Sequence, residues 1–96
     1  MKMVMLTYNE AIDTEIMEIL ESSGGTNYTK LTNVFGKGSS SGTHLGNDVW
    51  PGKNSMLFVS CGEKEAKDLM TRVRKLRSTL SKEGVKAFAM TLDDVT

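Results

Sequence analysis

Apolar positions along the chain fall into short runs and into spaced stripes, and the two patterns predict different elements. Met1–Thr7 is a short apolar run with a β-branched residue, which predicts a buried strand. Ser55–Cys61 has the same character. Asn27–Phe35 is rich in β-branched and aromatic residues, and Val85–Leu92 is again mostly apolar, so each is expected to be a further strand.

Two other segments have apolar residues at helical spacing. The first helix is expected to begin with Asp13 as its N-cap and to end at Gly24-Gly25. The second is predicted from about Glu63 to Lys82, and its apolar stripe comprises Ala66, Leu69, Met70, Val73, Leu76 and Leu80. The order β-α-β-β-α-β predicts a single α+β domain over residues 1–96. We expect a ferredoxin-like fold, with an antiparallel sheet and both helices on one face.

Residues 36–54 interrupt this regular pattern with a long loop between the second and third strands. The segment begins with a run rich in glycine and serine, which favours a loop. A loop of this length in a small domain is usually functional. It holds the only histidine, His44, and the only tryptophan, Trp50, which we take as candidate partner-binding residues. The alternative is that Trp50 covers the sheet of a neighbouring subunit.

Composition and charge exclude several classes of partner. Twelve basic and twelve acidic residues cancel, so the chain has no general attraction to nucleic acid or anionic lipid. The basic run Arg72–Arg77 suits the end of a helix, and no aromatic pattern for stacking RNA bases accompanies it, so we expect no nucleic-acid partner. The single cysteine, Cys61, cannot form an intrachain disulfide, and the N-terminal apolar run is too short for a signal peptide. These features predict a cytoplasmic protein.

No catalytic arrangement is recognisable, so we expect no enzyme activity. The chain has neither a Ser-His-Asp arrangement nor a Cys-His pair of familiar spacing. A metal site is the alternative chemistry, with His44 and Asp48 as ligands and Cys61 as a distant third. A trimer could bring several copies of these residues together near its axis or its clefts.

Three features of the chain resemble a known family. Met1–Val4 leading into Ile12–Leu20 is similar to the first strand and first helix of the P-II-like signalling proteins. Val34-Phe35-Gly36-Lys37-Gly38 is similar to the Gly-Phe-Gly that closes its second strand. The loop of residues 36–54 stands where the family carries its T-loop. The resemblance extends over nearly the whole chain.

This resemblance implies a homotrimer whose sheets surround a central axis, with ligand clefts between subunits. ATP or ADP is the implied small-molecule effector, and the T-loop would contact a protein target such as a membrane transporter. The implied ligand-binding residues are Phe35, Gly36, Lys37, Gly38 and Lys86.

Two segments depart from the family pattern. The family's glycine-rich turn with a lysine corresponds here to Ser78–Lys86, which has one glycine and a glutamate, and Asp93–Thr96 lacks the family's paired arginines. These departures favour the wider P-II-like group, which keeps the trimer and changes the ligand. The leading hypothesis is a regulatory trimer that senses a small ligand. The alternatives are a metal-binding trimer related to divalent-cation-tolerance proteins and a purely structural oligomer.

Overall fold

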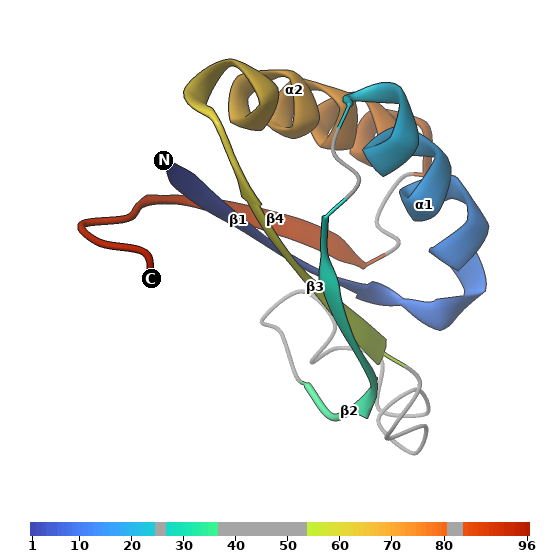
Figure 1. Ribbon diagram of the computed structural model, residues 1–96. Coiled ribbons are helices and arrows are strands. Elements are labelled where there is room, and N and C mark those ends of the chain that lie inside the picture. The colour runs from blue at the N-terminus through green and yellow to red at the C-terminus, as the bar shows by residue number, and fades with distance from the viewer. Residues whose placement is uncertain (25–26, 37–53, 81–83) are drawn as a thin grey trace.

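The computed structural model describes residues 1–24, 27–36, 54–80 and 84–96 as a four-stranded sheet with two α-helices (Figure 1). The strands occur in the order β2-β3-β1-β4, and every neighbouring pair is antiparallel. This arrangement confirms the predicted ferredoxin-like fold. Its elements are β1 (Lys2–Asn9), the 3-10 turn η1 (Glu10–Ile12), α1 (Asp13–Ser22), β2 (Thr29–Val34), β3 (Asn54–Cys61), α2 (Glu63–Leu80) and β4 (Val85–Thr91).

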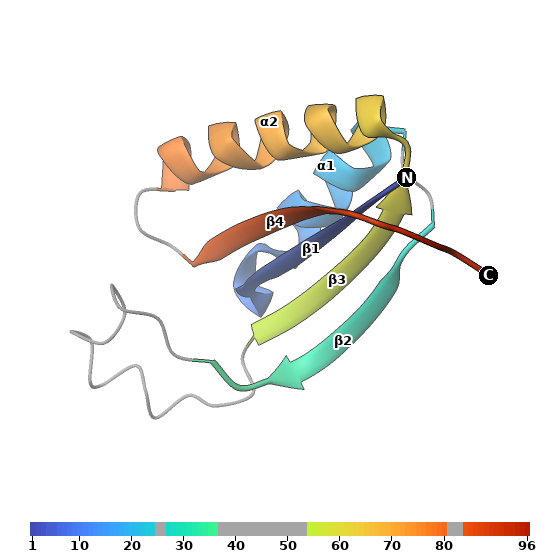
Figure 2. The ribbon, with the colours of Figure 1, turned by 90° about the vertical axis from the view of Figure 1, so that its left-hand side faces the viewer.

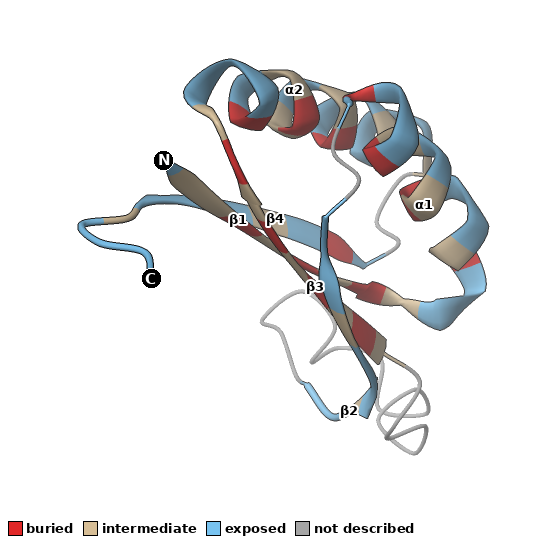
Figure 3. Ribbon diagram, in the orientation of Figure 1, coloured by how far each residue is buried: buried red, intermediate tan, exposed pale blue. Residues whose placement is uncertain are grey.

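Both helices cover the same face of the sheet (Figure 2). Alternate residues of β1 and β3 point toward them, and these residues are buried. Val4, Leu6, Leu57 and Val59 are each at most 1 % exposed. The helices turn their buried residues toward this face and their exposed residues away from it (Figure 3). The core of the described residues therefore lies in the single layer between helices and sheet.

The apolar stripe predicted for the second helix is the face of α2 that packs on the core. Ala66, Leu69 and Val73 are buried. The other members of the stripe, Met70, Leu76 and Leu80, are partly buried and pack against the same core. The predicted end at Lys82 lies outside the described residues.

The start of α1 differs from the prediction, in which Asp13 was the N-cap. Asp13 is the first residue of the helix, and Ile12 stands at the N-cap without a side-chain hydrogen bond. The chain instead turns through η1, whose N-cap Asn9 accepts a hydrogen bond from the backbone N–H of Ala11 through Oδ1, at 2.8 Å. The Asp13 carboxylate bonds to Tyr8 and Lys30 instead. A hydroxyl and an ammonium group therefore replace the backbone amides as its partners.

Strand β2 spans Thr29–Val34 and is therefore shorter than the predicted Asn27–Phe35, and its pairing with β3 is irregular near its end. Leu31 pairs with Met56 and Val34 with Asn54, with a register shift between the two pairs. Asn33 has φ 58°, a left-handed conformation that asparagine tolerates better than most residues. The irregularity redirects the chain just before residues 36–54 begin.

Candidate functional site

Several chain segments converge at one end of the sheet, which we call the loop base: Asn9, Phe35, Gly36, Asn54 and Gly84. Asn54 begins β3 and pairs with Val34 on one side and Asn9 on the other. The backbone N–H of Asn9 donates to the carbonyl oxygen of Gly84 at 3.0 Å. Both ends of the 36–54 segment and the start of β4 therefore lie at the same end of the molecule.

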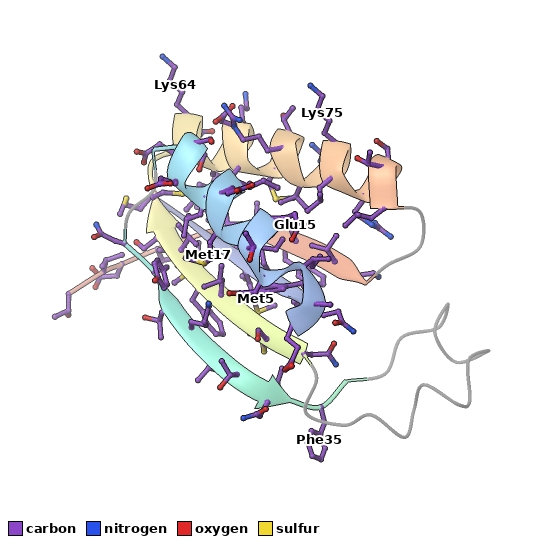
Figure 4. The ribbon with its side chains drawn as sticks, turned by 90° about the vertical axis from the view of Figure 1, so that its right-hand side faces the viewer. Met5, Glu15, Met17, Phe35, Lys64 and Lys75 are labelled. Atoms are coloured by element: carbon purple, nitrogen blue, oxygen red, sulfur yellow. The ribbon has the colours of Figure 1, made fainter. Side chains whose placement is uncertain are left out.

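Phe35 is the most exposed large apolar side chain among the described residues. It is 75 % exposed and points away from the body of the molecule at the end of β2 (Figure 4). Gly36 follows it and lies beside Asn54, since a Cβ on Gly36 would lie 3.8 Å from Asn54 Nδ2. An aromatic ring in this position is free to stack on a planar ligand or to pack on another chain.

Lys86 lies at the same end of the sheet but on the opposite edge. It is exposed on β4 and pairs with Thr7, whereas Phe35 follows β2. Strands β3 and β1 stand between them, so three strand spacings of about 4.8 Å separate the two edges by roughly 14 Å. One subunit therefore does not bring Lys86 together with Phe35 and Gly36. Their joint role as ligand-binding residues stays a prediction.

Beneath the loop base, three polar side chains join β1, α1 and β2. Tyr8 is 1 % exposed, and its Oη donates to Asp13 Oδ1 at 2.6 Å. Lys30 Nζ lies 2.9 Å from Asp13 Oδ1 and donates to Oδ2 at 3.1 Å. The pKa of Asp13 is lowered mainly by the hydrogen bond from Tyr8. The hydrogen bond and the positive charge of Lys30 lower it further. Burial, reinforced by Asp13, raises the pKa of Tyr8 well above its ordinary value.

This polar cluster of Tyr8, Asp13 and Lys30 was not recognised in the sequence. The three residues belong to separate elements, and their spacing matches no functional motif. A tyrosine in an apolar strand gives no indication of its partner, which only the packing of α1 on β1 determines. Among the described residues, no buried side-chain nitrogen or oxygen lacks a hydrogen-bond partner, and the buried hydroxyl of Tyr8 has its partner in Asp13.

Cys61 lies at the far end of β3 from the loop base. It is buried and pairs with Lys2, whereas Asn54 is at the other end of the strand. Burial raises the pKa of the thiol, and nearby Glu65 adds to the effect. The described residues contain no group of three potential metal ligands. The metal site of Cys61 with His44 and Asp48 stays a prediction, since both loop residues lie outside the described part.

The remaining predicted site residues also lie outside the described ranges. These are Lys37 and Gly38 of the ligand-binding set and Trp50 of the partner-binding set. The neighbours of Lys37 and Gly38 in the chain, Phe35 and Gly36, place the start of that segment at the loop base.

Comparison with known proteins identifies the family. The family model described as nitrogen regulatory protein P-II matches residues 1–96. The chain belongs to the P-II family. Proteins of this family are regulatory, act as trimers and bind small effectors and protein targets. No curated protein matches this P-II family member significantly.

Solved structures similar to this P-II family member share its fold at low sequence identity. A nitrogen regulatory PII-like protein, CPII, from Thiomonas intermedia bound to ADP, AMP and bicarbonate is 17 % identical, with a TM-score of 0.71 over 92 % of this chain and 81 % of that one. The apo form of CPII is 15 % identical, with a TM-score of 0.64 over 95 % and 89 %. A PII-like signalling protein from Thermus thermophilus is 19 % identical, with a TM-score of 0.67 over 92 % and 81 %.

These likenesses confirm the fold, and the family model over residues 1–96 confirms the predicted kinship with P-II proteins. None of the helices in the described part of the chain is both long and apolar enough to cross a membrane. The solved relatives are too distant in sequence to transfer ligand-binding residues to this chain, so the set that the resemblance implies stays a prediction.

Proposed function

We propose that this chain is a non-enzymatic regulatory homotrimer that binds an adenine nucleotide between subunits and contacts a protein target through residues 36–54. Membership of the P-II family over residues 1–96 carries this proposal. A similar protein, CPII, has been solved with ADP and AMP bound, which supports an adenine nucleotide as the effector here. The regulator would act in the cytoplasm, where a single unpaired cysteine such as Cys61 is common.

The face of the sheet that the helices leave open supports the homotrimer. Neither helix lies on this side (Figure 2). Phe88 and Met90 on it are 43 % and 41 % exposed. We call it the open face: Met3, Met5, Leu31, Met56, Phe58, Phe88 and Met90. An apolar face of this kind is typical of an interface, and symmetric copies of the same chain can bury it against one another.

The edges of the sheet support a cleft between subunits. Phe35 and Gly36 adjoin one edge and Lys86 lies on the other. In a ring of three copies, the β4 edge of one subunit would face the β2 edge of its neighbour. This arrangement would bring Lys86 of one subunit close to Phe35 and Gly36 of the next. A phenyl ring suits the adenine base and a lysine suits a phosphate. The proposed ligand-binding residues are Phe35, Gly36, Lys37, Gly38 and Lys86.

We further propose that nucleotide binding at the loop base changes the affinity of residues 36–54 for the target. The nucleotide site and the target-binding site share this segment. By linkage, a nucleotide that raises the affinity for the target is itself bound more tightly when the target is present. His44 and Trp50 are the proposed contacts, and a membrane transporter is the proposed kind of target.

The first test is a thermal-shift panel of ATP, ADP and AMP on the purified protein, with its mass measured by sedimentation. A nucleotide that binds only the folded state raises the melting temperature by mass action. We expect a trimer mass and a stabilising nucleotide. Phe35→Ala should remove the nucleotide shift without lowering the melting temperature of the free protein, because Phe35 is exposed.

Lys64→Ala is the matched surface control, because Lys64 projects from α2 away from the sheet (Figure 4). It should leave the nucleotide shift unchanged. A monomer mass would contradict the trimer. A trimer whose melting temperature is unchanged by every adenine nucleotide would contradict the proposed effector but not the proposed trimer.

A further inference from the structure

A hollow lies between α2 and the sheet, at the end opposite to the loop base. Its volume is about 450 Å³. Its apolar lining comes from Ala66 and Met70 of α2 and from Ala89 of β4. Lys2 is one of its basic residues and stands at the other end of β1 from Asn9, seven residues or roughly 24 Å away at about 3.4 Å per residue. The hollow is therefore separate from the loop base. We call it the α2–β4 pocket.

A small side chain creates this pocket. Ala89 pairs with Val4, whose side chain is fully buried under the helices, so Ala89 belongs to the same helix-facing side of the sheet. Ala89 is nevertheless exposed, because a methyl group does not fill the space below α2. A larger apolar residue in this position would close the gap and extend the core.

Basic side chains surround the pocket. Lys67 and Arg74 contribute from α2 and Lys2 from β1, against one acidic residue, Glu63. Lys67 and Arg74 lie seven residues apart, which places them on one side of the helix two turns from each other. Lys2 Nζ donates to Thr91 Oγ1 at 2.9 Å, which anchors its ammonium group near the end of β4.

The cations on α2 differ in whether they are already paired. Arg72 forms an ion pair with Asp68, with 2.9 Å between Nε and Oδ2. Within the described ranges, Lys67 and Arg74 form no ion pair. Their charges are therefore available to a ligand, and Thr71, which lies between them in the helix, lines the same pocket.

We propose that the α2–β4 pocket binds a metabolite-sized anion that carries a carboxylate or phosphate group on an apolar body. The volume is in the range of small-molecule sites, which combine an apolar lining with a few polar groups that orient the ligand. Lys67, Arg74 and Lys2 hold the anionic group, and Ala66, Met70 and Ala89 contact the apolar body. This site goes beyond the proposed nucleotide cleft and does not depend on it.

The test uses three probes on the purified protein in its native assembly. Phenyl phosphate and phenylacetate carry the two anionic groups on one apolar body, and inorganic phosphate lacks that body. Isothermal titration should show binding of at least one phenyl probe and weaker binding of inorganic phosphate. The better phenyl probe tells which anionic group the site prefers. Affinity should fall as salt rises, because exposed charges are screened.

Two kinds of variant locate the site. The double variant Lys67→Gln with Arg74→Gln should weaken the phenyl probe at least about tenfold, because hydrogen bonds to charged groups are among the stronger ones. Lys64→Gln makes the same change on the same helix but away from the sheet, and should leave the affinity unchanged (Figure 4). Ala89→Leu should abolish binding by filling the pocket without changing any charge, and a thermal melt checks that it folds.

Four results would overturn the proposal. They are no binding of either phenyl probe, equal loss of affinity in Lys64→Gln, unchanged binding in the double variant, and displacement of the probe by ADP. The last result would place the probe in the nucleotide cleft. Undisturbed probe binding at saturating ADP would support a separate site. If the protein binds no nucleotide, the charge variants still decide the question, so the two proposals fail independently.

Discussion

The two faces of the sheet carry nearly the same kind of side chain but have different surroundings. On the covered face, Leu57 and Val4 are fully buried beneath the helices. On the open face, Met5 and Phe58 pair across β1 and β3 and remain partly exposed. An antiparallel sheet with one solvated face usually alternates apolar with polar residues. Strand β1 instead is apolar on both faces over most of its length.

The core of one subunit therefore accounts for only part of the apolar residues of the sheet. The covered face stabilises the subunit. The open face, which contributes little to the subunit alone, is suited to association. Replacing a residue on one face should therefore change folding, and replacing one on the other should change assembly.

The largest effect is expected from Leu57→Ala on the covered face. Leu57 is fully buried, and truncating a buried leucine to alanine costs about 2–5 kcal/mol because a cavity remains. Denaturant unfolding monitored by circular dichroism measures the loss. Leu31→Ala on the open face is the matched control, because Leu31 is 46 % exposed, and it should cost clearly less in the dissociated subunit. Equal losses would remove the distinction between the faces.

The next effect is expected from Phe88→Glu on the open face. Phe88 pairs with Met5, and a carboxylate here would be buried three times in a symmetric trimer, where unpaired charges are strongly unfavourable. Sedimentation should show a subunit mass with retained secondary structure. Thr79→Glu, exposed on α2, should stay assembled. An intact Phe88→Glu trimer would show that another surface forms the interface.

A smaller effect is expected from Tyr8→Phe, which removes the main polar group of the covered face. The change deletes the hydrogen bond to Asp13 but keeps the ring, so the free energy of unfolding should fall by about 1–3 kcal/mol. Tyr28→Phe is the control, since Tyr28 is 46 % exposed, and should have almost no effect. If the two variants have the same free energy of unfolding, the cluster of Tyr8, Asp13 and Lys30 does not stabilise the fold.

The smallest effect is the pH dependence that Asp13 contributes. Its pKa is lower in the folded protein than in the unfolded chain, because Tyr8 and Lys30 stabilise the carboxylate. The unfolded chain therefore binds the proton first, and this stabilisation is complete above the ordinary aspartate pKa of about 4 and is lost as the pH falls through the folded pKa. Asp13→Asn should flatten the fall in unfolding free energy between pH about 6 and about 3. An unchanged slope would assign that fall to other carboxylates.

The elements of the fold could be predicted because they depend on local periodicity. The helical stripe of α2 and the apolar runs of β1 and β3 each indicate their own structure. Asp13 shows the limit of such reasoning. Its position before an amphipathic stripe is typical of an N-cap, but the packing of Tyr8 and Lys30 offers the carboxylate other partners. The preference of Asp13 for the N-cap is therefore outweighed by its contacts with side chains of two other elements.

The candidate site could be predicted only as a segment. The resemblance of Val34–Gly38 to the P-II pattern pointed to the end of the second strand, and the fold places Phe35 and Gly36 at the loop base. The position of Lys86 on the opposite edge could not be foreseen, because it depends on the strand order β2-β3-β1-β4. The same holds for the α2–β4 pocket, whose residues come from β1, α2 and β4.

The order of the elements, their type and the kinship with P-II proteins could be recognised from the residues alone, because periodicity and short motifs are properties of neighbouring residues. The face of the sheet that the helices cover and the polar groups that meet beneath the loop base depend on packing between distant segments. The same packing leaves a pocket beside Ala89 under α2. An apolar residue in a strand is favoured on either face, and only the packing of helices against one of them selects which residues become the core.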